Sequence, residues 1–104
     1  KAVEFMGIQE SAYDLSLRIA EIVRYLKEEG GEFPLGDKLL DCGVRAGIST
    51  REGKLKAAAD YVQQADYILE MAVKSGYLSE RQSLPIRSDC ASLLTALDKA
   101  NHFQ

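Results

Sequence analysis

The feature that most constrains the fold is an apolar spacing of three and four residues that recurs in four separate segments. In the first segment this spacing puts five apolar side chains on one face of an α-helix, namely Ala12, Leu15, Ile19, Ile22 and Leu26. No segment shows the strict alternation that marks a half-buried strand over a useful length. The sequence therefore predicts an all-α protein in which each helix buries one apolar stripe.

The first helix is predicted to run from about Ser11 to Glu29. Ser11 followed three residues later by Asp14 resembles a capping box, with aspartate in place of the usual glutamate. Gly30 and Gly31 are predicted to end this helix, because glycine adopts the left-handed C-cap conformation without steric cost.

The second helix is predicted to begin near Pro34, because proline suits a first helical turn. Gly43 and Gly47 lie one turn apart beside its stripe, although glycine inside a helix costs about 1 kcal/mol relative to alanine. We interpret the two glycines as a site of close helix packing. The alternative is a kink or an early helix end near residues 48–50. The stripe itself consists of Leu35, Leu39, Cys42 and Ala46.

The third helix is predicted from about Lys54 to Ser75, with Gly76 ending it. Its stripe is Leu55, Ala58, Val62, Ala65, Leu69 and Ala72. The segment from Ser79 to Gln82 fits a capping box for a fourth helix, whose stripe is Ile86, Cys90, Leu93, Leu97 and Ala100. Pro85 either kinks this helix or follows a short turn before a helix that begins there. Residues 101–104 are predicted to fray.

Short connections make neighbouring helices antiparallel, so the sequence predicts an up-down-up-down four-helix bundle forming a single domain over residues 1–104. In such a bundle the second and fourth helices are diagonal. That separation makes a bridge between Cys42 and Cys90 difficult. We expect two buried, reduced thiols, with a structural disulfide as the alternative.

The residues that carry catalytic or metal chemistry are sparse. The single histidine, His102, stands near the C-terminal end with no glutamate three residues before it, so the Glu-x-x-His pairs of di-iron bundles are missing. The two cysteines are too far apart in sequence for a thiolate zinc motif. The Gly30-Gly31 pair lacks a P-loop lysine. We therefore predict no catalytic residue, cofactor, metal or small-molecule substrate.

The formal net charge of −3 argues against a nucleic-acid binder, because phosphate contacts require a basic surface. One stretch has the opposite balance, with Glu52 as the only acid among four basic residues, Arg45, Arg51, Lys54 and Lys56. It is either a solvated turn between helices or a patch that contacts the phosphates of RNA or DNA.

Five tyrosines are spread over the predicted helices. Tyr61 and Tyr67 lie partly off the main stripe of the third helix, which suggests a second contact surface for a partner or another copy of the chain.

No apolar run approaches the roughly 20 residues that a membrane-spanning helix needs. Residues 1–9 lack the sustained apolar stretch and the small-residue cleavage site of a signal peptide, so a cytoplasmic location is the default expectation.

Several short motifs resemble the bacterial "four helix bundle" family, which is known from open reading frames in intervening sequences of 23S ribosomal RNA genes. In order along the chain they are Tyr25-Leu26-Lys27-Glu28-Glu29, Glu32-Phe33, Leu39-Leu40, Gly43, Gly47, Arg51-Glu52-Gly53, Tyr67-Ile68-Leu69-Glu70, Ser75-Gly76-Tyr77-Leu78-Ser79-Glu80 and Asp89-Cys90. The resemblance covers roughly Ser11 to Lys99.

This resemblance implies a four-helix bundle that assembles into a ring-like homopentamer, in a family whose biochemical function is mostly unestablished. A related branch serves retroelements as an accessory protein that binds nucleic acid and a reverse transcriptase, but that branch is basic. We therefore expect a non-enzymatic homo-oligomer, a pentamer in preference, that acts as an assembly or interaction module. The alternative is an RNA- or DNA-binding accessory factor that uses the basic residues.

The chain departs from the family at three places. The family's Ser-x-Gly-x-Asn signature is replaced by Arg45-Ala46-Gly47-Ile48-Ser49, and its Glu-Thr pair by Gln64-Ala65. Both changes weaken the transfer of a polar role to these positions. The connection between Gly53 and Lys54 is shorter than in the family, through a genuine deletion or through a segment missing between the two residues.

Overall fold

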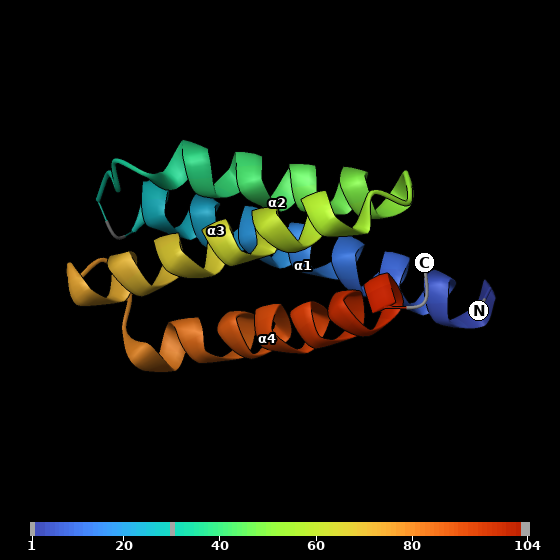
Figure 1. Ribbon diagram of the computed structural model, residues 1–104. Helices are drawn as coiled ribbons and strands as arrows, with labels where there is room; N and C mark the ends of the chain where they lie inside the picture. Colours follow the sequence, from blue (N-terminus) through green and yellow to red (C-terminus); the bar gives the residue numbers. More distant parts are fainter. Residues whose placement is uncertain (1, 30, 103–104) are drawn as a thin grey trace.

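The computed structural model describes residues 2–29 and 31–102, with side chains from residue 5 onward. Four helices span them: α1 (Ala2–Glu28), α2 (Gly36–Arg51), α3 (Leu55–Lys74) and α4 (Glu80–His102). Each packs against its neighbours in sequence, and α4 closes the bundle against α1 (Figure 1). The described residues include no strand. The prediction of an all-α, up-down-up-down bundle is confirmed.

The predicted stripes meet in one core along the bundle axis. Its largest fully buried apolar side chains are Leu15, Ile19, Leu26, Leu39, Val62, Leu69, Cys90 and Leu97. Burying an aliphatic side chain of this size contributes roughly 1.5–3 kcal/mol, so the core is the main source of stability.

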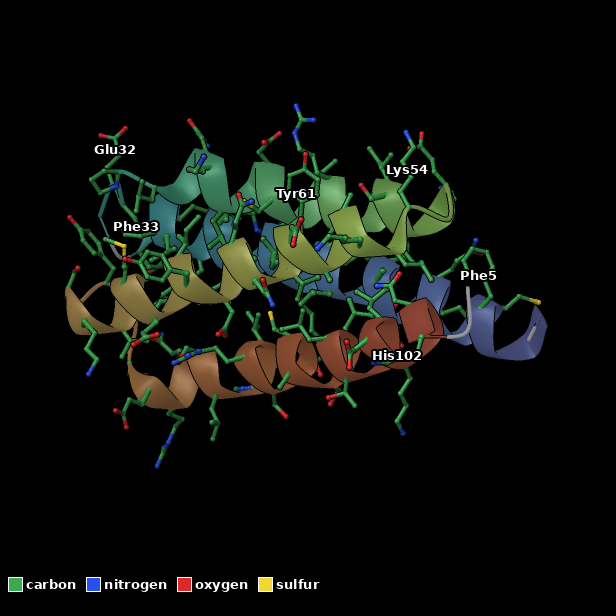
Figure 2. The ribbon with its side chains drawn as sticks, in the orientation of Figure 1. Phe5, Glu32, Phe33, Lys54, Tyr61 and His102 are labelled. Atoms are coloured by element: carbon green, nitrogen blue, oxygen red, sulfur yellow. The ribbon has the colours of Figure 1, made fainter. Side chains whose placement is uncertain are left out.

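The prediction that the first helix begins at Ser11 is wrong. Helix α1 begins at Ala2, and Ser11 is an exposed residue inside it rather than an N-cap. The physical reason is that the buried stripe continues upstream: Ile8 belongs to the core and Phe5 packs against it. The N-terminal turns of α1 extend past the ends of the neighbouring helices (Figures 1 and 2).

Helix α1 ends at Glu28, within one residue of the prediction. Gly31 has φ +81°, the left-handed conformation expected of a glycine that reverses the chain. Gly30, which was predicted to share this role, lies outside the described residues.

Helix α2 begins at Gly36, so the prediction that Pro34 occupies the first helical turn is wrong. Pro34 lies in a turn before the helix that is closed by a hydrogen bond from the Gly36 N–H to the Phe33 carbonyl oxygen, at 3.0 Å. The alternative of an early end near residues 48–50 is also wrong, because α2 continues to Arg51. The buried Thr50 hydroxyl is satisfied by the Ala46 carbonyl at 2.8 Å.

The chain passes from α2 to α3 in a three-residue turn. Gly53 has φ +79°, and its N–H donates to the Thr50 carbonyl at 3.0 Å. The next N–H, of Lys54, donates to the Ser49 carbonyl at 2.8 Å. This pair of bonds is a Schellman motif, which satisfies the last carbonyl groups of α2.

A second Schellman motif ends α3, as the position of Gly76 predicts. Gly76 has φ +85° and donates to the Val73 carbonyl at 3.0 Å, while the Tyr77 N–H donates to the Ala72 carbonyl at 2.9 Å. The Tyr77 ring then packs on Phe33, with the ring centroids 4.9 Å apart. This aromatic contact covers the end of the core beneath the turn that follows α1.

The capping box of α4 is confirmed: the Gln82 N–H donates to the Ser79 hydroxyl oxygen at 3.0 Å, and the Ser79 N–H donates to the Gln82 side-chain oxygen at 2.8 Å. The alternative in which a turn precedes a helix that begins at Pro85 is wrong, because α4 begins at Glu80 and includes Pro85. Residues 101 and 102 are helical rather than frayed, and residues 103–104 lie outside the described part of the chain.

Candidate interaction surface

The two thiols are free and buried, on the diagonal helices α2 and α4. Burial raises the pKa of Cys42, whose sulfur lies 3.7 Å from the Gln64 side-chain oxygen. Burial also raises the pKa of Cys90 to about 12. Because the thiolate is the reactive form, both groups are poor nucleophiles at neutral pH.

In the described part of the chain, no three His, Cys, Asp or Glu side chains are grouped so that they could hold a metal ion. His102 is largely exposed, with its Nε2 3.7 Å from an Asp98 carboxylate oxygen. None of the described helices combines the length and the apolarity that crossing a membrane requires.

An open depression of about 410 Å³ lies between α2 and α3, beside Tyr67, Gln64 and Lys38.

The four basic residues of the predicted phosphate patch differ in their surroundings. The Arg45 Nε lies 2.9 Å from an Asp41 carboxylate oxygen, and this hydrogen bond raises the pKa of Arg45. Arg51 lies on the α1 side of α2, with its guanidinium 5.8 Å from the centre of the Tyr13 ring. Lys54, in the turn after α2 (Figure 2), is 3.3 Å from the Glu52 carboxylate. Two of the cations therefore face carboxylates of their own chain.

Gly43 and Gly47 lie where α2 packs on α1. A Cβ atom on Gly43 would be 3.0 Å from Ile19 Cδ1, and one on Gly47 would be 2.7 Å from the Ser16 hydroxyl oxygen. The Ser16 hydroxyl is placed to donate to the Gly43 carbonyl at 2.7 Å and to the Ala12 carbonyl at 3.0 Å. The two backbones therefore approach closely, with one serine between them.

The outer sides of these two closely packed helices carry four exposed apolar side chains, and we call this surface the α1–α2 face. It is formed by Tyr13 and Leu17 on α1 and by Val44 and Ile48 on α2, each pair one helical turn apart. The four side chains are between 43% and 52% exposed. Groups of exposed apolar side chains on neighbouring elements are typical of interaction sites, whereas single ones are ordinary.

Sequence reasoning missed the α1–α2 face, although a signal for it exists. Leu40, Val44 and Ile48 follow one another at four-residue spacing, beside the core stripe of α2. Such a second stripe widens the apolar side of a helix beyond what one core needs. Ser16 was also missed, because nothing local indicates which carbonyl its hydroxyl meets.

The two tyrosines proposed for an interface differ in their environment. Tyr61 is half-buried against the core, on the side of α3 that meets α2 and Arg45 (Figure 2). Tyr67 is 64% exposed, and Met71 follows it one turn later at 38%. Tyr67 therefore offers a free apolar ring to a partner, and Tyr61 does so much less.

No family model matches the sequence, and no curated protein is significantly similar to it. The structure is similar to the crystal structure of a protein of unknown function from the S23 ribosomal protein family of Bacteroides thetaiotaomicron. The TM-score is 0.89 and the sequence identity is 20%, over 93% of this chain and 96% of that chain. At this identity the similarity establishes the four-helix fold along almost the whole chain.

Proposed function

We propose that this protein is a non-enzymatic, homo-oligomeric four-helix bundle that acts as an assembly or interaction module, and that it belongs to the family of intervening-sequence four-helix proteins. The observation that carries the proposal is the α1–α2 face, where Tyr13, Leu17, Val44 and Ile48 gather on two adjacent helices. The family assignment is supported by the resemblance of the sequence motifs and by the fold shared with an S23-family protein.

The energetics favour association through this face. Full burial of a side chain of the size of Leu or Ile is worth roughly 1.5–3 kcal/mol, and each of these side chains is about half exposed in the single chain. Interfaces between copies of one protein have an apolar centre with a polar rim. Arg51 beside Tyr13 provides a cation at such a rim.

We further propose that five copies form the assembly, because the family that the chain resembles assembles into ring-like homopentamers. A ring repeats each surface of the chain around its axis, so a weak contact made by one copy is multiplied. The cytoplasm is the location that we expect for such an assembly.

Nucleic-acid binding is the alternative, and the structure gives it no specific support. Arg45 and Lys54 face Asp41 and Glu52, which reduces the charge they offer to phosphates. A filter-binding series with structured RNA from low salt to about 0.15 M would test it, because phosphate contacts give a steep salt dependence. We expect little retention. Strong retention that Arg51→Ala and Lys56→Ala weaken would favour the alternative.

The experiment that tests the proposed function is the absolute mass in solution, measured by light scattering behind a sizing column at several protein concentrations. We expect a stable multiple of the chain mass for the wild type and a monomer for Val44→Asp/Ile48→Asp. Leu84→Asp is the matched control, since Leu84 is an isolated, 68% exposed leucine on α4. A wild-type chain that stays monomeric at every concentration would refute the proposal.

A further inference from the structure

We propose that copies associate head to tail, with the α1–α2 face of one copy receiving an exposed stripe on α3 of the next. This inference rests on the proposed self-association and adds which two surfaces meet. The α3 stripe is defined by Tyr67 and Met71 at its centre and by Lys56 and Lys74 at its ends.

The α3 stripe has a fixed geometry. Lys56 and Lys74 are 18 residues apart, which is five full helical turns and about 27 Å, so both extend from the same side of α3. Tyr67 and Met71 are exposed between them. Neither lysine is ion-paired with another described residue, and Lys38 of α2 adds a third amine beside Tyr67. Even with Asp60 included, the surface is basic around an apolar centre.

The α1–α2 face has an acidic border with the same dimensions. Glu10 and Glu28 of α1 are also 18 residues apart and share one side of the helix, with Glu21 close to the same line. All three are exposed, and none of them is ion-paired with another residue in the described ranges. Leu17 lies between them, on the side toward Tyr13. Exposed Arg24 lies between Glu21 and Glu28, and Arg51 lies beside Tyr13 at the other edge of the face. With Arg24 included, the border on α1 still carries a net negative charge beside the apolar centre.

These two surfaces complement each other in charge, apolar content and length. When α3 of one copy runs antiparallel to α1 of the next, Lys56 can face Glu28 while Lys74 faces Glu10. This alignment places Tyr67 opposite the middle turns of α1, near Leu17. The apolar centre would supply affinity, while the charged ends would fix the register and speed encounter. Both halves of the match are on one chain, so the partner is a second copy.

A symmetric pairing of like surfaces is disfavoured by the same charges. Two α3 stripes would bring four lysines together, and two acidic borders would bring their glutamates together, so each pairing carries like-charge repulsion. The contact that remains joins two different surfaces. Such a heterologous contact leaves one free surface at each end until a ring closes.

Mixing two blocked variants tests this geometry. Val44→Asp/Ile48→Asp blocks the α1–α2 face, and Tyr67→Asp/Met71→Asp blocks the α3 stripe, all at exposed positions where circular dichroism can verify the fold. We expect each variant alone to be monomeric. An equimolar mixture retains one intact surface of each kind, so it should give a mass of two chains and nothing larger.

The possible results separate the inference from the proposed function. If the wild type assembles and the Tyr67→Asp/Met71→Asp variant assembles equally well, the head-to-tail inference is wrong while self-association stands. A mixture that stays monomeric also overturns it. If the wild type itself is monomeric at all concentrations, the proposed function fails first.

A charge exchange tests the register. Lys56→Glu/Lys74→Glu should weaken association about tenfold at low salt, and adding Glu10→Lys/Glu28→Lys to the same chain should restore it. Arg81→Glu/Lys99→Glu is the charge-matched control, because both residues are exposed on α4, away from the two surfaces. In about 1 M salt the differences should shrink. Equal weakening by the control, or no restoration, would contradict the register.

Discussion

The Ser16 hydroxyl oxygen lies 2.7 Å from the Gly43 carbonyl oxygen, so a side chain of α1 is hydrogen-bonded directly to the backbone of α2. This hydroxyl occupies the space that a side chain at position 47 would need, since a Cβ on Gly47 would be 2.7 Å from it. The two helices are therefore held at a separation that depends on two glycines and one serine.

Gly47→Ala should destabilise the protein by about 1–3 kcal/mol, the usual cost of overpacking. The added methyl group would force the Ser16 side chain to rotate or the helices to separate, and the hydrogen bond to Gly43 would be lost. Urea unfolding at one fixed protein concentration measures the free energy of unfolding.

Gly7→Ala is the matched control, because a Cβ at that position of α1 meets no atom within 4 Å. That substitution should stabilise the protein by up to about 1 kcal/mol through helix propensity alone. If Gly47→Ala were as favourable as Gly7→Ala, the close approach of α1 and α2 would not be a constraint.

Ser79→Ala should cost about 1 kcal/mol, because the hydroxyl that accepts the Gln82 N–H at the start of α4 disappears. Pro85 follows in the second turn of α4 and supplies no N–H for a helical hydrogen bond, so hydrogen exchange in the first turn should rise in the variant. Thr95→Ala, at an exposed position inside α4, provides a comparison that should be neutral or slightly stabilising. Equal losses in both variants would argue against a capping role.

Arg87→Gln should destabilise the protein by about 1 kcal/mol at most, the upper end for a partly exposed ion pair. Its guanidinium joins α4 to α3 by hydrogen bonds of 2.9 and 3.3 Å to Asp66. Arg45→Gln removes an exposed pair within one helix and should have no measurable effect on unfolding. If both variants unfold like the wild type, the contact between α3 and α4 depends on apolar packing alone.

The buried thiol of Cys90 should make stability depend on pH in the alkaline range. Its pKa is about 12 in the folded state against 9.0 for a free thiol. The stabilisation from this group is therefore complete below pH 9 and is lost as pH rises from about 9 to about 12, because only the unfolded chain releases the proton. The slope approaches about 1.4 kcal/mol per pH unit.

This expectation is checked by measuring the free energy of unfolding of the wild type and of Cys90→Ala from pH 8 up to the highest pH at which both proteins still fold. The alanine variant should start lower, because it leaves a small cavity, and the difference between the two proteins should shrink as pH rises. All other ionisable groups are common to both proteins, so their contribution cancels in the difference. A constant difference across this range would contradict the prediction.

The helices themselves were predictable because their stripes are complete: the stripe residues Leu15, Leu39, Leu69 and Leu97 are all buried. Turn residues with a specific backbone requirement were predictable too, as at Gly76. The start of α1 was not, because Ser11 has the local chemistry of a cap while Ile8 gains more from burial in the core.

The candidate surface was harder to predict, because it depends on which flanks of two helices come together. Nothing in the sequence around Arg51 indicates that its guanidinium lies over Tyr13, 38 positions away. The charge excess around Arg51 was visible, but the direction of each side chain was not, and the structure pairs two of these cations with carboxylates. Val44 and Ile48 can be identified as a second apolar stripe of α2 only after the first stripe of that helix has been assigned to the core.

The order of helix contacts has a consequence for how the chain folds. Three of the four seams join helices that are adjacent in sequence, two of them across tight Schellman turns, and only the seam between α1 and α4 joins distant segments. Local contacts close short loops, so the successive hairpins should form on the fast timescale of helical proteins. The α1–α4 seam, the least extensive of the four, should then form after the transition state, with a φ-value near zero for a truncation of the buried Leu93, which lies beside Leu15 of α1.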